Sequence, residues 1–403
     1  GHYWDHEWPN CISVPDNMAM SAWQQVPGWG TVEWIVIVAS GIAHLVYFNV
    51  LLAGYRAALR EAGIAFRPEL VSQGDGKAGG GLEAMESLLK LRQFEFALEQ
   101  FEAALAAGAH VKSLDDYRRL CDEAAEDPEG FWAEAAEKIS WYKKWDKVLD
   151  ASNKPFFKWF VGAKTNIVHN AIDRHLKTYR KNKLALIWES EDGKLERTFS
   201  YHALNREVNR MANIIKAMGV VKGDRVTIYM GRVPEIVFAM LACAKIGAIH
   251  SVVFGGFSVD SLQGRIEDSQ SKLVITMDRS FNNGKVVELK RTVDEALKRC
   301  PSVENVIVVK RTGQPVNMEA ERDHWYHDLS VLPIANGKCA TEVMDAEDPL
   351  FILYTSGSTG KPKGVLHTTG GYMVYTEFTF RNVFQYQEGD IYWCTADVGW
   401  ITG

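Results

Sequence analysis

A glycine-rich loop directly after a short apolar run constrains this chain of 403 residues more than any other stretch. The apolar run, residues 350–354, is short and rich in β-forming side chains, and it predicts a buried strand. The loop at 355–364 reads Thr-Ser-Gly-Ser-Thr-Gly-Lys-Pro-Lys-Gly. Its glycines let the backbone approach a ligand closely, and its hydroxyls and lysines supply donors and positive charge. Because nucleotides bind at the ends of strands in α/β sheets, the stretch predicts a polyphosphate-binding loop.

This loop differs from the Walker A pattern, G-x-x-x-x-G-K-[ST], in two respects. Only two residues separate Gly357 from Gly360, and Pro362 stands where Walker A has a magnesium-binding hydroxyl. A residue that precedes proline is disfavoured in helical geometry, so Lys361 is a poor start for a helix. A P-loop kinase is therefore a poor explanation of this chain.

The composition describes a globular protein with room for two or three domains. Hydrophobic residues make up 47% of the chain and charged residues 24%, which is enough for a sizeable core. The net charge of -6, without a block of lysine and arginine, predicts no nucleic-acid partner. The six cysteines lack paired spacing, so we predict neither a disulfide framework nor a metal site. Reduced thiols and the lack of a visible secretory signal favour a cytoplasmic protein.

The first hundred or so residues differ in character from the rest. Residues 34–53 form an apolar stretch of about the length of a membrane span. Ser40, His44 and Asn49 interrupt it, and polar side chains in hydrocarbon are costly, so we favour a core helix of a soluble domain and expect no membrane partner. A glycine-rich joint follows at 72–81. We expect residues 1–110 to form an extra, mainly helical module of unknown role.

Strand and helix patterns alternate along the second half of the chain, which is typical of an α/β fold. The predicted strands are 184–188, 225–230, 249–254, 272–276 and 303–309, and the predicted helices are 201–218, 234–246, 259–269 and 292–299. The unit 225–254 reads as a right-handed βαβ crossover. The polar stretch 317–347 is predicted to be a surface excursion.

The glycine-rich loop resembles the phosphate-binding motif of adenylate-forming enzymes. The wider stretch 354–403 is similar to AMP-forming acetyl-CoA synthetases, and the tryptophan-rich stretch from Ser113 reads like the amino-terminal cap of that family. The resemblance implies a cap at 111–170, followed at 171–403 by the AMP-binding domain, which is incomplete on its carboxy-terminal side. The added leading module suggests a fusion, such as the ligase portion of a propionyl-CoA synthase.

The resemblance implies ligation of a small carboxylic acid to coenzyme A with ATP. The carboxylate would attack the α-phosphorus of ATP, which releases pyrophosphate and forms an acyl-adenylate, and the thiol of coenzyme A would then form the thioester. The loop would hold the other phosphates in line, and Mg2+ would arrive with the nucleotide. The catalytic charge would come from Lys361 or Lys363. The phosphate-binding residues would be Thr355, Ser356, Gly357, Ser358, Thr359 and Gly360.

Two stretches would bind coenzyme A by the same resemblance. Gly256, in the turn after the strand 249–254, matches a glycine close to the nucleotide part of coenzyme A. Asn282 and Lys285 stand where the family has a basic pair for the 3'-phosphate. Lys285 keeps a charge, whereas Asn282 lacks the guanidinium fork, so the affinity for the 3'-phosphate stays open.

The acyl group would lie near the end of the sequence. Trp400, Ile401 and Thr402 match positions that line the small acid pocket of the family, where valine is usual in place of Ile401. One methylene changes discrimination by only about 1–3 kcal/mol. Acetate, propionate and 3-hydroxypropionate are therefore not separated by the sequence.

Other functions stay open. The adenine-binding, ribose-binding and catalytic-lysine segments of the family lie beyond Gly403, so we expect further domains of a longer polypeptide and no activity of this stretch alone. A non-catalytic nucleotide-binding or scaffolding fragment is the alternative. Adenylation for peptide synthesis or light emission uses the same loop but is disfavoured by the tryptophan-rich cap. The sequence is compatible with an oligomer.

Overall fold

The computed structural model describes residues 108–282, 284–355 and 362–400. The chain divides into two compact units, Gly1–Ala109 with Glu388–Thr395, and His110–Gln387 with Ala396–Gly403. The fold described below belongs to the second unit. The apolar stretch 34–53, the glycine-rich joint 72–81 and the module predicted around them lie outside the described residues.

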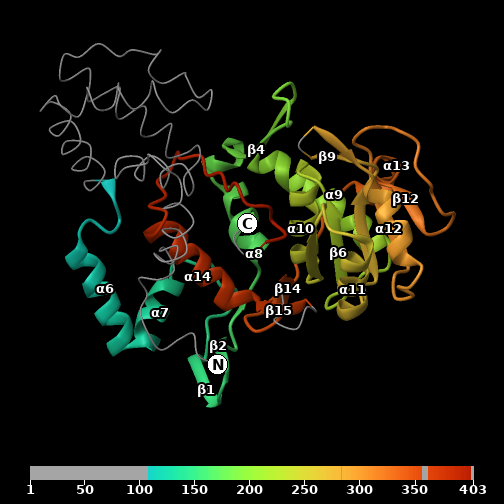
Figure 1. The fold of residues 1–403 in the computed structure, drawn as a ribbon. Coiled ribbons are helices and arrows are strands. Elements are labelled where there is room, and N and C mark those ends of the chain that lie inside the picture. Colours follow the sequence, from blue (N-terminus) through green and yellow to red (C-terminus); the bar gives the residue numbers. More distant parts are fainter. Residues whose placement is uncertain (1–107, 283, 356–361, 401–403) are drawn as a thin grey trace, which may run out of the picture. The chain divides into compact units, whose positions relative to one another are not determined.

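A seven-stranded sheet forms the centre of this unit (Figure 1). The strand order is β12-β11-β8-β6-β7-β14-β15, and all neighbours are parallel except the antiparallel pair β14 and β15. The strands are β6 (Arg225–Met230), β7 (Ile249–Phe254), β8 (Leu273–Met277), β11 (Asn305–Val309), β12 (Asp323–Trp325), β14 (Pro349–Thr355) and β15 (Lys363–Thr368). The predicted α/β class is confirmed, and the strands predicted between 225 and 309 all lie in this sheet.

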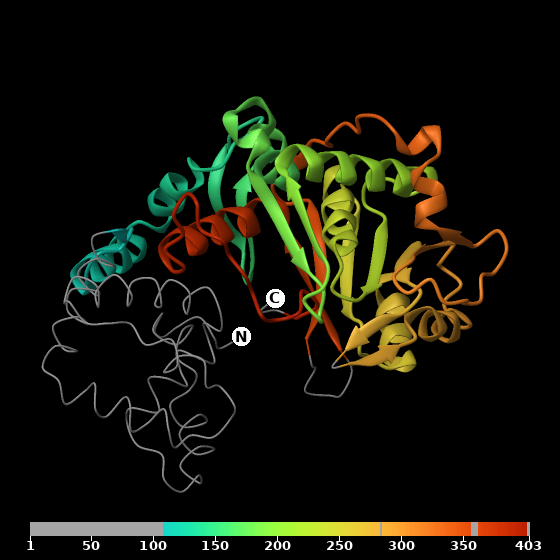
Figure 2. The same ribbon diagram turned by 90° about the horizontal axis from the view of Figure 1, so that it is seen from above.

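Helices cover both faces of the sheet. α10 (Pro234–Ile246) leads from β6 to β7, and α11 (Val259–Ser269) leads from β7 back past β6 to β8. Since such crossovers are right-handed, the reversal of direction puts α10 and α11 on opposite faces. α9 (Tyr201–Ala217) packs against α10, and α12 (Leu289–Leu297) packs against α11. Figure 2 shows the long α9 running along one side of the sheet.

The ends of these helices follow signals in the sequence. The side chain of Ser200 caps α9 by accepting a hydrogen bond from the Ala203 amide. Pro234 occupies the first turn of α10, and Gly247, with φ of 74°, ends it. Ser258 caps α11 in the same way as Ser200 caps α9. The predicted limits of all three helices are confirmed to within one residue.

A tryptophan-rich segment precedes the sheet and has a core of its own. Its elements are α6 (Leu114–Glu126), α7 (Pro128–Ala136), β1 (Lys147–Asn153), β2 (Phe156–Val161) and β3 (Lys164–Thr165). Trp141, Trp145 and Trp159 pack on the buried Phe160, and Trp132 packs on Trp159. The later helix α14 (Thr369–Asn382) also contributes to this core. These tryptophans are therefore packing residues.

Short elements connect the larger ones. They are α8 (Ile167–Ala171), the 3-10 helices at Asp173–Lys177, Tyr179–Asn182 and Pro333–Ala335, β4 (Leu184–Glu189), β5 (Glu196–Ser200), β9 (Ser280–Asn282), β10 (Lys285–Val287), α13 (Tyr326–Ser330) and β13 (Met344–Asp345). β4 pairs with β5, and β9 pairs with β10, each as an antiparallel hairpin. The strand predicted at 184–188 is therefore confirmed, although it lies outside the main sheet.

The polar stretch 317–347 is more than the predicted surface excursion. It contains β12, which extends the main sheet in parallel with β11. The Lys290 ammonium lies 2.8 Å from the Asp323 carboxylate, and neither side chain is exposed to solvent. The prediction was wrong here because charged residues usually mark a surface, whereas these two neutralise each other inside the fold.

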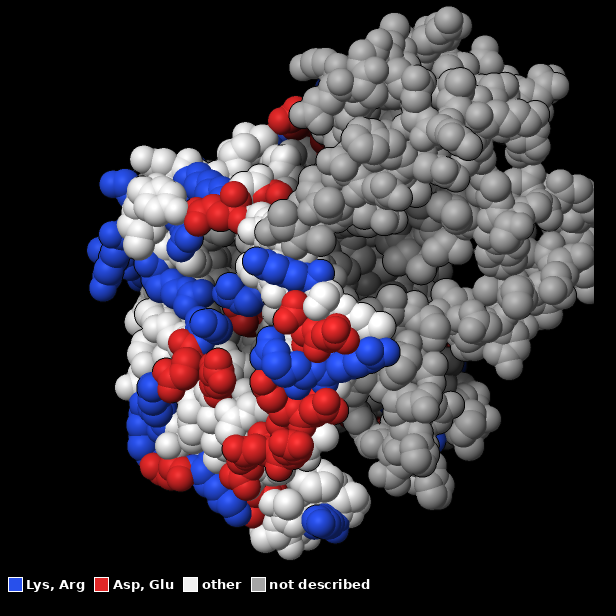
Figure 3. All heavy atoms as spheres, turned by 90° about the vertical axis from the view of Figure 1, so that its left-hand side faces the viewer, with Lys and Arg blue, Asp and Glu red and all other residues white. Residues whose placement is uncertain are grey.

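Charges on the surface are mixed. On the described part of the face in Figure 3, basic and acidic side chains lie next to one another. On α6, for example, Arg119 pairs with both Asp116 and Glu123. Within the ranges that the structure describes, no helix is both long enough and apolar enough to cross a bilayer.

Candidate functional site

The carboxyl ends of β6, β7, β8 and β14 lie at the same edge of the sheet, because these strands run parallel. β7 ends at Phe254 and leads into the predicted coenzyme A turn. Its neighbour β14 ends at Thr355, the first residue of the glycine-rich loop. The two predicted ligand-binding stretches therefore start from adjacent strands.

The glycine-rich loop is anchored on an antiparallel hairpin. Thr355 of β14 pairs with Lys363 of β15, and Tyr354 pairs with Gly364. Lys363, a predicted catalytic residue, begins β15 and is exposed. A side chain at Gly364 would lie 3.1 Å from Ile352, so glycine lets the strands approach closely. A strand, not a helix, follows the loop, which agrees with the rejection of Walker A.

Several predicted phosphate-binding residues cannot be placed from this structure. Ser356, Gly357, Ser358, Thr359, Gly360 and Lys361 lie outside the described residues, as do Ile401 and Thr402 of the acyl pocket. The positions that the structure does place are the two ends of the loop, Thr355 and Lys363, and the last described residue, Trp400.

A tight turn follows β7 at 254–257. The amide of Phe257 donates a 3.0 Å hydrogen bond to the Phe254 carbonyl. A Cβ atom at Gly255 would lie 3.0 Å from the backbone oxygen of Met230, and one at Gly256 would lie 2.5 Å from the Phe254 ring. A Cβ atom would thus meet protein atoms at both positions, which favours glycine there, and the backbone at Gly256 is exposed.

Trp400 packs on this turn. Its ring centroid lies 6.0 Å from that of Phe254 and 5.7 Å from that of Phe257. A Cβ atom at Gly399 would lie 2.9 Å from the Phe254 amide nitrogen, so the chain passes directly against the start of the turn. The structure thus brings a predicted acyl-pocket residue next to Gly256, a predicted coenzyme A residue.

Asp397 orders the segment in front of Trp400. Its carboxylate accepts a 3.0 Å hydrogen bond from the Gly399 amide, and its carbonyl accepts one of 2.9 Å from the Trp400 amide. The same carboxylate lies 3.5 Å from Arg232, which belongs to the loop after β6 at this edge. The sequence alone did not single out Asp397 or Arg232, because 165 residues separate them.

Asn282 and Lys285 lie opposite each other in the β9–β10 hairpin, which follows β8 at the same edge. Directly opposed residues of an antiparallel pair share a face, so the hairpin register brings the two positions together. Lys285 is exposed. Whether this face holds a phosphate stays a prediction.

A buried carboxylate fixes the base of this hairpin. Asp278, at the end of β8, accepts hydrogen bonds from the amides of Arg279 at 2.7 Å and Arg311 at 2.8 Å through one oxygen. Its other oxygen accepts from the amides of Thr312 at 2.9 Å and Gly313 at 2.7 Å. Asp278 thereby ties β8 to the loop after β11. Sequence reasoning missed it because most of its partners lie 33 to 35 residues away.

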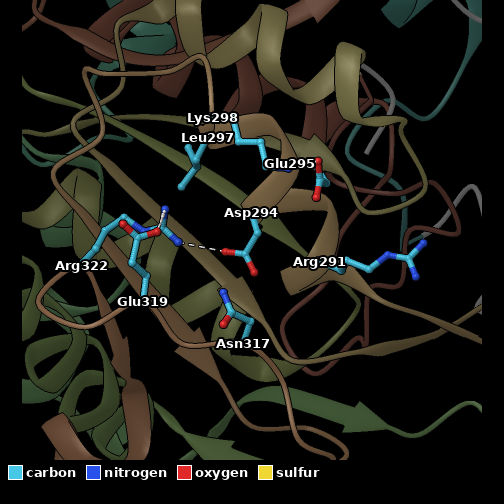
Figure 4. Close-up of a pocket in the computed structure, with 8 residues that line it drawn as sticks. All are labelled: Arg291, Asp294, Glu295, Leu297, Lys298, Asn317, Glu319 and Arg322. Carbon is cyan, nitrogen blue, oxygen red and sulfur yellow. Dashed lines mark hydrogen bonds and ion pairs between the residues drawn. The ribbon is translucent and has the colours of Figure 1, made fainter.

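A hollow beside α12, of about 420 Å³, lies among charged side chains (Figure 4). Its basic residues are each ion-paired: Arg291 with Glu288 at 2.7 Å, Lys298 with Glu295 at 2.6 Å and Arg322 with Asp294 at 2.9 Å. The hollow is therefore not built to attract an anion. In the part of the chain that the structure describes, no three His, Cys, Asp or Glu side chains gather as metal ligands.

The parallel sheet, its carboxyl edge and the glycine-rich hairpin define a class of protein that agrees with comparisons of sequence. Residues 172–403 match the AMP-binding enzyme family, and residues 117–171 match the acetyl-coenzyme A synthetase N-terminus. The chain belongs to the AMP-binding enzyme family. The resemblance drawn from the loop and the cap is thereby confirmed.

Curated relatives narrow the comparison to acetyl-coenzyme A synthetases. That of Parvibaculum lavamentivorans is 55% identical over 296 residues, or 73% of this chain and 45% of the relative. That of Chlorobaculum tepidum is 49% identical over 74% of this chain and 45% of the relative. Acetyl-coenzyme A synthetase 2 of Pseudomonas putida is 51% identical over 76% of this chain and 48% of the relative. The chain spans less than half the length of these relatives, and the link to a propionyl-CoA synthase stays a prediction.

Proposed function

We propose that this chain is the phosphate-binding and acid-binding part of an ATP-dependent short-chain acyl-CoA ligase. In the first step a carboxylate attacks the α-phosphorus of ATP, forming an acyl-adenylate and pyrophosphate. In the second step the thiol of coenzyme A attacks the acyl carbon, forming the thioester and releasing AMP. Acetate is the first candidate acid, because the relatives are named acetyl-coenzyme A synthetases. Propionate and 3-hydroxypropionate belong to the same proposal.

One observation supports the proposal: three predicted stretches lie at one edge of the sheet. They are the turn at 254–257, the start of the glycine-rich loop and the segment that ends at Trp400. β7 and β14 are parallel neighbours, so the turn at 254–257 and the start of the glycine-rich loop lie side by side. Trp400 packs on that turn. A ligase of this kind needs its phosphate, acyl and thiol sites to converge, since the acyl-adenylate made in the first step is the substrate of the second.

The roles proposed for the loop follow from its side chains. The hydroxyls of Ser356, Ser358 and Thr359 would donate to the β- and γ-phosphates and keep the α-phosphorus in line with the attacking carboxylate. The ammonium groups of Lys361 and Lys363 would balance the charge that moves onto pyrophosphate. Mg2+ bound to the nucleotide would supply further positive charge. Lys363 fits this role in one respect, since it is exposed at the carboxyl edge.

Coenzyme A would lie along the turn at 254–257 and the β9–β10 hairpin. The nucleotide part would approach the backbone of the turn at Gly256, which is exposed. Lys285 would attract the 3'-phosphate as a point charge. The acyl group would pack against Trp400, which is about half exposed at 48%.

The test is acid-dependent exchange of labelled pyrophosphate into ATP by the full-length protein. We expect exchange to require acetate or another short acid, and Lys361→Ala and Lys363→Ala together to lower it by at least about 100-fold, the effect of removing a group that stabilises transition-state charge. Lys298→Ala is the control, because Lys298, the residue that follows α12, is 66% exposed and bonded to Glu295. Exchange without acid would reject the ligase. Nucleotide binding without any exchange would favour the non-catalytic alternative.

A further inference from the structure

The phenol of Tyr229 lies directly beneath the turn after β7. Tyr229 is the fifth residue of β6, and its side chain is buried, with 1% exposure. Its hydroxyl donates to the carbonyl of Phe257 at 2.9 Å and to that of Gly255 at 3.2 Å. One O–H group thus holds two carbonyls of the turn in a three-centre hydrogen bond.

The turn at 254–257 needs a hydrogen bond from another element to fix the conformation of its backbone. Glycine has more conformational freedom than any other residue, and two glycines in succession form the middle of this turn. Within the turn, the Phe257 amide bonds to the Phe254 carbonyl at 3.0 Å. That bond closes the turn but does not fix the direction of the Gly255 carbonyl, which the Tyr229 hydroxyl does.

We infer that Tyr229 is a positioning residue for the thioester-forming step, acting through the backbone of Gly255 and Phe257. The inference rests on the proposed function, because it takes the turn as part of the coenzyme A site. Tyr229 does not itself reach a substrate, since it is buried and its hydroxyl is bonded to the turn.

The hydroxyl keeps its proton under all ordinary conditions. Burial raises the pKa of Tyr229 to about 12, so the phenol is protonated and remains a donor near neutral pH. Tyr229 lies on β6, and β7 separates it from β14, the strand that leads into the glycine-rich loop. Its loss should therefore act mainly on the step that uses coenzyme A, and less on the step that uses ATP and the acid, in which the turn takes part only through Trp400.

Tyr229→Phe in the full-length protein tests the inference, because it removes only the hydroxyl. We expect the KM for coenzyme A to rise at least about fivefold, while acid-dependent pyrophosphate exchange stays within about twofold of the parent protein. Incorporation of 4-aminophenylalanine at position 229 offers an N–H donor in place of the hydroxyl and should lower the KM again.

Tyr326→Phe is a matched control. Tyr326, on α13, is also largely buried, but its hydroxyl has no hydrogen-bond partner in the described structure. Its removal should change neither half-reaction. A KM for coenzyme A within twofold of the parent in Tyr229→Phe would overturn the inference, as would a parallel loss of both half-reactions. If the parent protein shows no acid-dependent exchange, the proposed function fails instead, and calorimetric binding of coenzyme A to both variants still decides the role of Tyr229.

Discussion

Asn282 stands where the resemblance to the family predicts a basic residue of the proposed coenzyme A site. It lies opposite Lys285 in the β9–β10 hairpin, so this pair of positions carries one cation where the resemblance implies two. Lysine offers a point charge, whereas arginine offers a planar fork that matches a phosphate. The identity of residue 282 should therefore set the affinity for the 3'-phosphate.

We expect Asn282→Arg to tighten coenzyme A binding by about tenfold, or about 1.4 kcal/mol, since an added charge-assisted hydrogen bond is worth this order of free energy. Isothermal titration with coenzyme A measures the change. Dephospho-coenzyme A, which lacks the 3'-phosphate, is the control ligand and should bind both proteins equally. An equal gain in affinity for both ligands would mean that the 3'-phosphate of coenzyme A does not bind near residue 282.

Residues differ in how clearly the sequence around them indicates their role. Ser200, Pro234 and Gly247 act on their own helices, so local patterns were enough to place them. Tyr229 and Asp278 act on backbone groups that are distant along the chain, and a tyrosine or aspartate at the end of a strand has many ordinary uses. Such residues become visible only when the sheet brings its strand ends together.

At the scale of elements, α12 and the edge strand β12 are joined by buried charges. The Lys290 ammonium bonds to Asp323 of β12 at 2.8 Å and to Asp294 of its own helix at 2.5 Å. Arg322 bonds to the same two carboxylates, at 2.7 and 2.9 Å. The network holds a strand of three residues that would pair weakly alone.

Lys290→Met should lower the free energy of unfolding by about 3 kcal/mol, because it leaves buried carboxylates with one cation fewer. Urea unfolding followed by circular dichroism measures the loss. Lys298→Met, at the exposed residue that caps the C-terminal end of the same helix, should change the free energy of unfolding by less than about 0.5 kcal/mol. A loss of similar size in both variants would mean that the helix and not the buried network is responsible.

Most strands of the sheet could be predicted from sequence because each gathers several apolar or β-branched side chains within five to seven residues. β12 could not be predicted, since Asp323, His324 and Trp325 show no apolar pattern. The order of the strands also does not follow from local patterns, and it is that order which places β14 next to β7. The glycine-rich loop was enough to identify the candidate site from sequence, but only the fold shows which segments lie next to that loop.

At the scale of the whole molecule, buried histidines couple stability to pH. His250 of β7 is 6% exposed, its Nδ1 atom has no hydrogen-bond partner in the described structure, and its ring stacks on Phe351 at 5.6 Å. Burial lowers the pKa of His250 from its ordinary 6.5 to about 4. Between these values the unfolded chain binds a proton that the folded chain does not, so the free energy of unfolding falls as the pH falls.

Because of His250, the free energy of unfolding should fall by about 2 kcal/mol between pH 7 and pH 5, since each pKa unit is worth about 1.4 kcal/mol. Urea unfolding at the two pH values measures it. His250→Phe should remove most of that difference, whereas His202→Gln should leave it unchanged, because His202 is exposed on α9. Burial also lowers the pKa values of His169 and His367, so both histidines further lower the free energy of unfolding as the pH falls. An unchanged difference in His250→Phe would contradict the prediction.

β15 follows the glycine-rich loop as a strand that begins at Lys363. A loop that opens a helix adds the aligned peptide dipoles of that helix to whatever anion it holds. Dipoles along a strand alternate and nearly cancel. A triphosphate bound at this hairpin would therefore be neutralised by lysine ammonium groups and by its metal ion, so its retention should weaken steeply as ionic strength rises.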